Sequence, residues 1–335
     1  MNTELSQIRS KRPRFPLPRY PTGWFFIDFS AELEAGQVKP VQAFGQELVL
    51  FRAEDGTAAL LDAFCPHMGA HLGHGGTVES GGVKCPFHAW VFGQDGNCKD
   101  IPYAKKIPPK AKVKPWTIQE VNGMIMAWHH IDGEAPGWEV PVVPELSDPE
   151  WSEPVRRNWK IRTHNQEMGE NTVDVAHFRY LHGTKNYPEA VVEFGYPLMH
   201  MRAETLMATP KGDATGVIES HVYGFGMALN RFLGLADTLL IATQTPIDDE
   251  IIDVTFNFYV KKMGNDDITR GVGKAFVDEV SRQLEQDIPV WENKIYVHPP
   301  MLAAGDGPVG KYRKWSKQFY PEHYIQEAVA AFEGR

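Results

Sequence analysis

Four residues in two short loops constrain this chain of 335 residues more than any other feature of its sequence. Cys65 and His67 have a single proline between them, and seventeen residues further on Cys85 and His88 are separated by a proline and a phenylalanine. Thiolates and imidazoles are characteristic ligands of transition metals. Proline after each cysteine restricts the backbone and stiffens the loop. The pattern therefore predicts a metal centre held between two rigid loops.

Iron–sulfur chemistry explains this ligand set better than zinc. In a Rieske [2Fe–2S] centre two thiolates hold one iron and two imidazoles hold the other. Structural zinc sites more often use pairs of like residues, such as Cys-x2-Cys followed by His-x3-His, whereas each loop here carries one of each type. We therefore predict that Cys65, His67, Cys85 and His88 bind a [2Fe–2S] cluster that transfers one electron at a time. A zinc-stabilised binding module is the alternative.

Bulk properties argue against other classes of protein. The net charge of −9 argues against a nucleic-acid partner, because neutralising phosphates needs a basic surface. The sequence has no run of 18 or more apolar residues, so we expect no stable membrane insertion. There are three cysteines, and we expect the third, Cys98, to be a packed free thiol. So few cysteines suit a reducing compartment, and we expect a cytoplasmic protein.

Proline, glycine and short apolar runs divide the chain into four expected segments. A basic, proline-rich arm spans residues 1–19, and residues 20–130 contain short β-like runs between glycine-rich turns. Prolines and glycines interrupt regular structure in a linker over residues 131–150. Residues 151–335 form the second domain. The expected fold class is α+β, with an all-β N-terminal domain.

Four elements can be predicted within the second domain. Residues 252–260 alternate between apolar and polar side chains, which predicts a half-buried strand. Residues 238–245 are expected to be its hairpin partner. Apolar positions at helical spacing predict a long helix over 267–291, and a further helix is expected over 166–182.

The predicted helix over 166–182 carries a second candidate metal site. Asp174 and His177 are three residues apart and would share a helix face, and His182 follows shortly before a glycine. Two histidines and a distant carboxylate form the facial triad of non-haem Fe(II) oxygenases, which leaves positions open for O2. Asp287 is the candidate carboxylate. The residues alone leave three acidic competitors: Asp278, Glu279 and Glu285.

Asp174 has another role available to it. Histidine ligands usually donate their second ring N–H to a carboxylate or carbonyl oxygen, which orients the ring. Asp174 could orient His177 in this way, or could reach a cluster histidine and connect the two metal sites.

These motifs resemble the Rieske non-haem iron oxygenases, the terminal components of ring-hydroxylating systems. Within that superfamily the chain is most similar to the 3-ketosteroid 9α-hydroxylase oxygenases and the related cholesterol 7-desaturases. The resemblance covers nearly the whole chain. The segments that carry it are 85–90, 96–109, 173–182, 286–294 and 306–320.

The resemblance implies roles for individual residues. His177, His182 and Asp287 would bind the mononuclear Fe(II). Asp174 would connect His88 of one subunit to His177 of the next, which implies a ring-shaped homotrimer. The catalytic domain would be a helix-grip, in which a curved antiparallel sheet closes over a long helix with an apolar cavity between them.

The implied function is a terminal oxygenase that uses O2 and electrons from NADH, delivered by a separate ferredoxin or flavin reductase. We expect it to hydroxylate, desaturate or demethylate a bulky apolar substrate such as a steroid or terpenoid. An aromatic-ring or aromatic-acid oxygenase is the alternative, for which Arg202 and Arg231 are available. A Rieske electron-transfer protein without mononuclear iron is a further alternative. The expected cavity wall is Tyr223, Phe225, Met227, Leu229, Phe232, Leu240 and Phe256.

Overall fold

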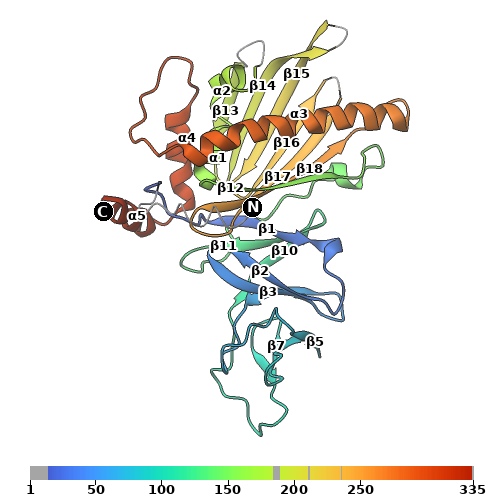
Figure 1. The fold of residues 1–335 in the computed structure, drawn as a ribbon, viewed down its shortest axis with the longest axis vertical. Helices are drawn as coiled ribbons and strands as arrows, with labels where there is room; N and C mark the ends of the chain where they lie inside the picture. Colours follow the sequence, from blue (N-terminus) through green and yellow to red (C-terminus); the bar gives the residue numbers. More distant parts are fainter. Residues whose placement is uncertain (1–13, 184–188, 210–211, 235, 334–335) are drawn as a thin grey trace.

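In the computed structural model, residues 14–183, 189–209, 212–234 and 236–333 are described. The chain forms a small β-rich part, blue to cyan at the bottom of Figure 1, and a larger part in which a broad sheet is crossed by one long helix. Residues 1–13 of the expected arm lie outside the described residues. Within the described part, no helix has the length and apolar character needed to span a membrane.

The N-terminal part contains three small antiparallel sheets among its described residues. The first joins β1 (Gly23–Phe29), β11 (Met124–His129) and β10 (Ile118–Val121). The second joins β2 (Val38–Ala43), β3 (Gln46–Arg52), β4 (Ala58–Asp62) and β9 (Pro115–Trp116). The third joins β5 (Thr77–Glu79), β6 (Gly82–Lys84), β7 (Val91–Gly93) and β8 (Cys98–Asp100).

A seven-stranded antiparallel sheet forms the base of the larger part, counting described strands. Its order is β12 (Val155–Arg162), β18 (Ile251–Val260), β17 (Thr238–Pro246), β16 (Met227–Leu233), β15 (Gly212–Tyr223), β14 (Leu198–Thr209) and β13 (Glu189–Phe194). The predicted hairpin is confirmed, since β17 pairs with β18 along its whole length. The predicted polar face of β18 is also buried at Thr255 and Asn257, because the N-terminal part covers that side of the sheet near Thr255.

The predicted long helix is confirmed as α3 (Asp266–Asn293), which crosses one face of the sheet (Figure 1). Val277, Leu284 and Trp291 recur every seven residues and pack into the main core, as expected for an amphipathic helix. Arg14, from the described end of the N-terminal arm, donates to the carbonyl oxygens of Trp291 and Arg162 at 2.9 and 2.6 Å. The arm therefore ties the end of α3 to the sheet.

The helix predicted over 166–182 is instead two short helices, α1 (Asn165–Glu170) and α2 (Val175–Tyr180). Asp174 lies between them, where its carboxylate accepts hydrogen bonds from the backbone N–H groups of Ala176 and His177 at 3.2 and 3.4 Å. Such an N-cap begins a new helix, which is why the chain does not continue as one. The remaining helices are α4 (Val309–Ser316), α5 (Glu322–Glu333) and the short 3-10 turns Ser30–Glu32, Pro144–Ser147 and Lys317–Phe319.

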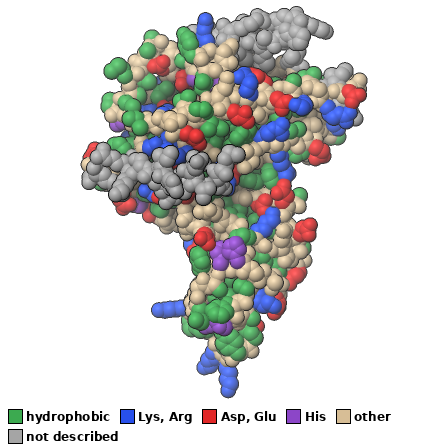
Figure 2. Space-filling view, in the orientation of Figure 1, with side chains coloured by type: hydrophobic (Ala, Val, Ile, Leu, Met, Phe, Trp, Pro, Cys, Tyr) green, Lys and Arg blue, Asp and Glu red, His purple; other side chains and the backbone are tan. Residues whose placement is uncertain are grey.

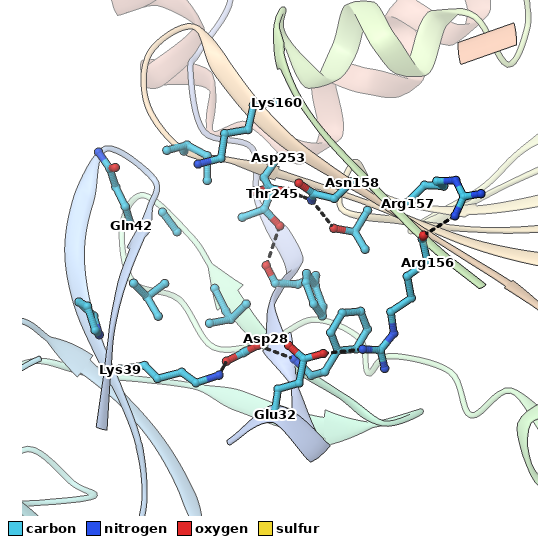
Figure 3. Close-up of a pocket in the computed structure, with 18 residues that line it drawn as sticks. Asp28, Glu32, Lys39, Gln42, Arg156, Arg157, Asn158, Lys160, Thr245 and Asp253 are labelled. Atoms are coloured by element: carbon cyan, nitrogen blue, oxygen red, sulfur yellow. Dashed lines mark hydrogen bonds and ion pairs between the residues drawn. The ribbon is translucent and has the colours of Figure 1, made fainter. Parts of the chain in front are cut away.

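The two parts of the chain meet along a junction with both tight and open regions. A crevice of about 550 Å³ lies between them (Figure 3). Arg156 pairs with Glu32 across it at 2.5 Å. Lys39 and Asp28, which pair at 2.7 Å, both belong to the N-terminal part. Deeper in the junction the Thr245 hydroxyl donates to the Phe26 carbonyl oxygen at 2.7 Å. Half-exposed ion pairs add little stability, so buried packing holds the two parts together.

The backbones of the two parts approach closely at Gly226, in the turn between β15 and β16. A Cβ atom added there would lie 1.9 Å from the carbonyl oxygen of Trp24 on β1. Because the obstacle is backbone, no side-chain rotation can relieve the contact.

We therefore expect Gly226→Ala to lower the free energy of unfolding by about 1–3 kcal/mol, the usual cost of overpacking. Gly271 is the matched control, since a Cβ there meets nothing within 4 Å. Gly271→Ala, inside α3, should raise stability by about 0.5–1 kcal/mol through helix propensity. Urea unfolding measures both, and equal stability of Gly226→Ala and the parent would contradict this account of the junction.

Candidate metal centres and active site

The two predicted cluster loops have the same backbone geometry. The amide N–H of Cys65 donates to the carbonyl oxygen of Ala70, and that of Cys85 donates to Trp90, five residues on in both cases. Each cysteine carbonyl oxygen accepts a hydrogen bond from the residue four positions on. Those residues, Gly69 and Ala89, both have positive φ, +77° and +56°. The sequence thus builds two equivalent turns that present a thiol and an imidazole each.

The side chains of these loops meet in two like pairs, and the thiol of Cys65 interacts with that of Cys85. The rings of His67 and His88 lie 4.6 Å apart between centroids, and Trp90 stacks on His67 at 4.6 Å. Trp90 is itself fixed by donating its indole N–H to the Tyr103 hydroxyl at 2.8 Å.

The donor atoms of the loops fit a [2Fe–2S] cluster. His88 Nδ1 is buried and has no hydrogen-bond partner among the described residues, as expected of a nitrogen reserved for a metal. Cys65 and Cys85 are buried, and burial, with a smaller effect from the neighbouring Cys85, raises the pKa of Cys65 to about 11. Iron coordination deprotonates such thiols and offsets this penalty. Cys98 is also buried but its thiol donates to the Asp100 carbonyl oxygen at 3.4 Å.

A second group of metal-binding side chains lies where α2 faces α3. One ligand atom each from His177, His182 and Asp287 lies within 4.8 Å of the others. His182 Nε2 is 3.5 Å from Asp287 Oδ2, and the two imidazole rings are 5.0 Å apart between centroids. Asp287 is only 7% exposed. Two imidazoles and one carboxylate on one side of a metal are the facial triad that binds non-haem Fe(II).

The acidic competitors of Asp287 all have other partners. Asp278 pairs with Lys274, Glu279 pairs with Arg282 at 2.6 Å, and Glu285 accepts from the Trp159 indole at 3.4 Å. The sequence holds a signal that separates them. Asp287 follows Leu284 by three residues and precedes Trp291 by four, so it lies on the apolar stripe of α3. A carboxylate on a buried stripe needs a partner such as a metal.

Hydrogen bonds orient both histidines toward the site. The Nδ1 atom of His177 bonds to the backbone carbonyl oxygen of Asp174, and that of His182 bonds to Gln286 Oε1 at 3.1 Å. Each ring thus presents Nε2 toward the metal side. Burial lowers the pKa of His177. Burial also opposes protonation of His182, but hydrogen bonds with Asp287 and Gln286 raise its pKa overall. Sequence reasoning missed Gln286, which carries no pattern of its own.

A cavity of about 710 Å³ borders the three candidate ligands. Three residues of the predicted wall line it: Phe232, Leu240 and Phe256. Others on its wall were not predicted, among them Met168, Asn171, Met201, Ile218, Ser220, Asn230, Ala242, Gln244, Phe276 and Val280. Most of these are apolar, so the space suits an apolar ligand.

The other four predicted wall residues lie elsewhere. Tyr223, Met227 and Leu229 pack with the aromatic core at the junction with the N-terminal part, and Phe225 packs against Phe319. For the three strand residues the reason is the alternation of side chains along a strand, which directs neighbours to opposite faces, whereas Phe225 lies in the turn between β15 and β16.

The two arginines that an aromatic-acid substrate would need also lie away from the cavity. Arg231 Nε pairs with Glu145 at 2.6 Å, and Arg202 lies 3.8 Å from Glu204. Among the described residues, no lysine or arginine lines the cavity.

Removing the hydrogen bond from Gln286 tests the geometry of the second centre. We expect Gln286→Leu to weaken Fe(II) binding about 10- to 100-fold, since outer partners of metal-bound histidines have effects of this size. Competition with an iron chelator measures the affinity, and cluster absorption should stay unchanged. Gln326→Leu, on the exposed helix α5, is the control. Unaltered iron affinity in Gln286→Leu would refute the positioning role.

Comparison with known proteins agrees with this arrangement. Residues 23–116 match the Rieske [2Fe-2S] domain, and residues 127–320 match the 3-Ketosteroid 9alpha-hydroxylase C-terminal domain. The chain is 34% identical to a cholesterol 7-desaturase of Ciona intestinalis, with 95% of this chain and 72% of the relative covered. It is 31% identical to a probable 3-ketosteroid-9-alpha-monooxygenase oxygenase component of Rhodococcus rhodochrous, with 98% and 87% covered.

Solved structures share the fold. NdmA of Pseudomonas putida with caffeine superposes with a TM-score of 0.73 at 21% identity, covering 93% of each chain. One family model matches more than half of the chain, and relatives above 30% identity cover most of it. These matches establish the family. The chain is an oxidoreductase of the Rieske oxygenase family, in the group whose catalytic domain is that of the 3-ketosteroid 9α-hydroxylases.

Proposed function

We propose that this chain is the terminal oxygenase component of a multicomponent system, and that it hydroxylates, desaturates or demethylates a bulky apolar substrate such as a steroid. One observation carries the proposal. The candidate ligands His177, His182 and Asp287 open into a cavity of about 710 Å³ whose described wall has no lysine or arginine. Ligand pockets of this size are typical for small molecules. A carboxylate substrate would lack a cationic partner here.

Two sets of residues would bind two cofactors. A [2Fe–2S] cluster held by Cys65, His67, Cys85 and His88, and an Fe(II) ion held by the three ligands named above, supply electron transfer and O2 activation when bound. The protein supplies orientation and exclusion of water. Gln286 fixes the ring of His182, and the apolar wall keeps the substrate's reacting carbon in a dry space.

Polar groups within the cavity favour a substrate with one polar end. Gln244 lines the cavity, and its Oε1 atom is buried with no hydrogen-bond partner among the described residues. Ser220 and Asn230 also line it but bond to each other at 2.7 Å. A buried amide without a partner in an apolar cavity suits a hydroxyl or carbonyl group on a large apolar skeleton. The relatives named for 3-ketosteroids and cholesterol support the same class of substrate.

Electron transfer is proposed to cross a subunit boundary. The loops next to β5 and β7 lie at the far end of the molecule from α2 (Figure 1). Asp174 is 37% exposed at its side chain and contacts His177, so a neighbouring subunit could reach it. We therefore propose a homotrimer in which Asp174 accepts a hydrogen bond from the partner subunit's cluster histidine, corresponding to His88.

The tip that carries the cluster loops has the surface expected of a contact region. Hydrophobic side chains gather there (Figure 2), and the exposed ones are Phe64, Met68, Phe87, Tyr103 and Ile107. Scattered exposed apolar residues are normal, but a group of them marks an interaction site. The proposed partners are the neighbouring subunit and a cytoplasmic ferredoxin or flavin reductase that passes on electrons from NADH.

The decisive experiment compares the parent with His177→Ala. With a reductase, NADH and O2, we expect steroids, and not aromatic acids, to stimulate NADH and O2 consumption in the parent. His177→Ala should keep the visible absorption of the cluster and lose both product and stimulation, because the iron site is incomplete. Product formed by His177→Ala would contradict the iron assignment.

Other outcomes separate the alternatives. If only aromatic acids stimulated NADH and O2 consumption, the substrate class would be aromatic acids and not steroids. A protein with cluster absorption, no third iron and no product with any compound would be an electron-transfer protein. A colourless protein without acid-labile sulfide would be the zinc-binding module.

Asp174→Asn tests the bridging role without breaking α2, because Asn is as good an N-cap as Asp. We expect both metal sites to remain intact. Oxidation of the reduced cluster by O2 with substrate should slow by about 10- to 100-fold, as for other outer partners of metal ligands. Stopped-flow absorption measures this rate, and Asp267→Asn, which is exposed at the start of α3, is the control. A normal rate in Asp174→Asn would exclude the bridge.

A further inference from the structure

A third set of metal-binding side chains lies on the face of the large sheet that is turned away from α3. His200 on β14 is directly paired with His221 on β15, and Glu219 lies two residues before His221. Directly opposed residues share a face of a sheet, and so do residues two apart along a strand. The three side chains therefore project from the same face. Their neighbours Met201 and Ser220 project from the other face and line the iron cavity.

The donor atoms of these three residues are already gathered. One ligand atom each from His200, Glu219 and His221 lies within 4.8 Å of the others. His200 Nε2 is 3.2 Å from Glu219 Oε1, and the imidazole rings are 4.6 Å apart between centroids. All three residues are half-buried. His221 Nδ1 is buried and has no hydrogen-bond partner in the part of the chain that the structure describes.

The charged residues around His200 and His221 leave the Glu219 carboxylate available to bind a metal ion. Arg202 and Arg231 are the residues paired with Glu219 on its two neighbouring strands. Arg231 is neutralised by Glu145, with Nε 2.6 Å from the carboxylate. Arg202 lies 3.8 Å from Glu204. Glu219 thus faces the histidines rather than an arginine.

A fourth donor stands next in the same row of the sheet. Glu193 on β13 is paired with His200 on the side opposite His221. It is exposed, and its carboxylate is not among the three gathered donors. The gathered donors are therefore two imidazoles and the Glu219 carboxylate, and Glu193 or water would supply a fourth ligand.

We propose that His200, Glu219 and His221 bind a divalent transition-metal ion, with Zn²⁺ as the best-matched ion, at a site separate from the two iron centres. Two histidines and one glutamate are an established zinc ligand set, with the fourth position open. Imidazole suits zinc, and zinc imposes no geometric preference of its own on the site. The ion would join β14 to β15 and so fix the two strand segments whose opposite face lines the iron cavity.

The test measures Zn²⁺ binding where the iron triad cannot interfere. The starting protein carries its [2Fe–2S] cluster and the changes His177→Ala and His182→Ala, which remove two ligands of the other site. Equilibrium dialysis with Zn²⁺, followed by metal analysis, should find one Zn²⁺ per chain. Adding Glu219→Gln or His221→Ala should abolish that equivalent. His323→Ala is the matched control, since His323 is an exposed histidine paired with Asp132 at 3.3 Å, and it should leave binding unchanged.

Thermal unfolding gives an independent readout. An ion that binds only the folded state raises the unfolding midpoint, so Zn²⁺ should raise it in the starting protein and not in the Glu219→Gln variant. Glu219→Gln preserves shape, and its unfolding midpoint without Zn²⁺ reports that the sheet is folded. The proposal is overturned if the starting protein binds no Zn²⁺, or if Glu219→Gln and His221→Ala both bind as much as the control.

Discussion

The buried carboxylate of Asp287 meets His177 and His182 only because α3 packs against the large sheet. Most of the larger part of the chain holds these three side chains in place. Asp287 reaches His182 only because Leu284 and Trp291, its neighbours on the same stripe of α3, are held in the core of the sheet. The histidine side is fixed differently. The Asp174 cap starts α2, and a two-point pair between Arg313 and Glu170 at 2.7 and 2.9 Å holds the preceding helix.

The two faces of the large sheet contribute side chains to different sites. One face and α3 enclose the cavity beside His177, His182 and Asp287, while the other face carries the junction with the N-terminal part and the proposed zinc site. Adjacent residues can therefore serve different sites, as Ser220 and His221 do. This arrangement also explains why a substrate wall cannot be inferred from composition alone. A run of apolar residues such as that around Met227 and Leu229 supplies both faces in turn.

Several features could be predicted from residues alone, and each has a local cause. The equivalent turns at Cys65 and Cys85 follow from their proline and small residues, and the strands and long helix follow from apolar periodicity. Two further features, besides the cavity wall, could not be predicted. The break at Asp174 depends on a capping geometry that competes with helix continuation, and Gln286 gains its role only when α3 meets His182.

The sequence by itself determined the chemistry available to this protein: two thiols, paired imidazoles and the carboxylates near them, in segments whose local structure follows from spacing. Only the tertiary structure decided which of these groups meet. In the folded chain Asp287, and not its acidic neighbours, lies beside His177 and His182. Arg202 and Arg231 lie outside the cavity, and His200 lies beside His221 on the neighbouring strand. The physical reason is that spacing along the chain sets local geometry, whereas contacts between distant segments depend on which faces are buried together.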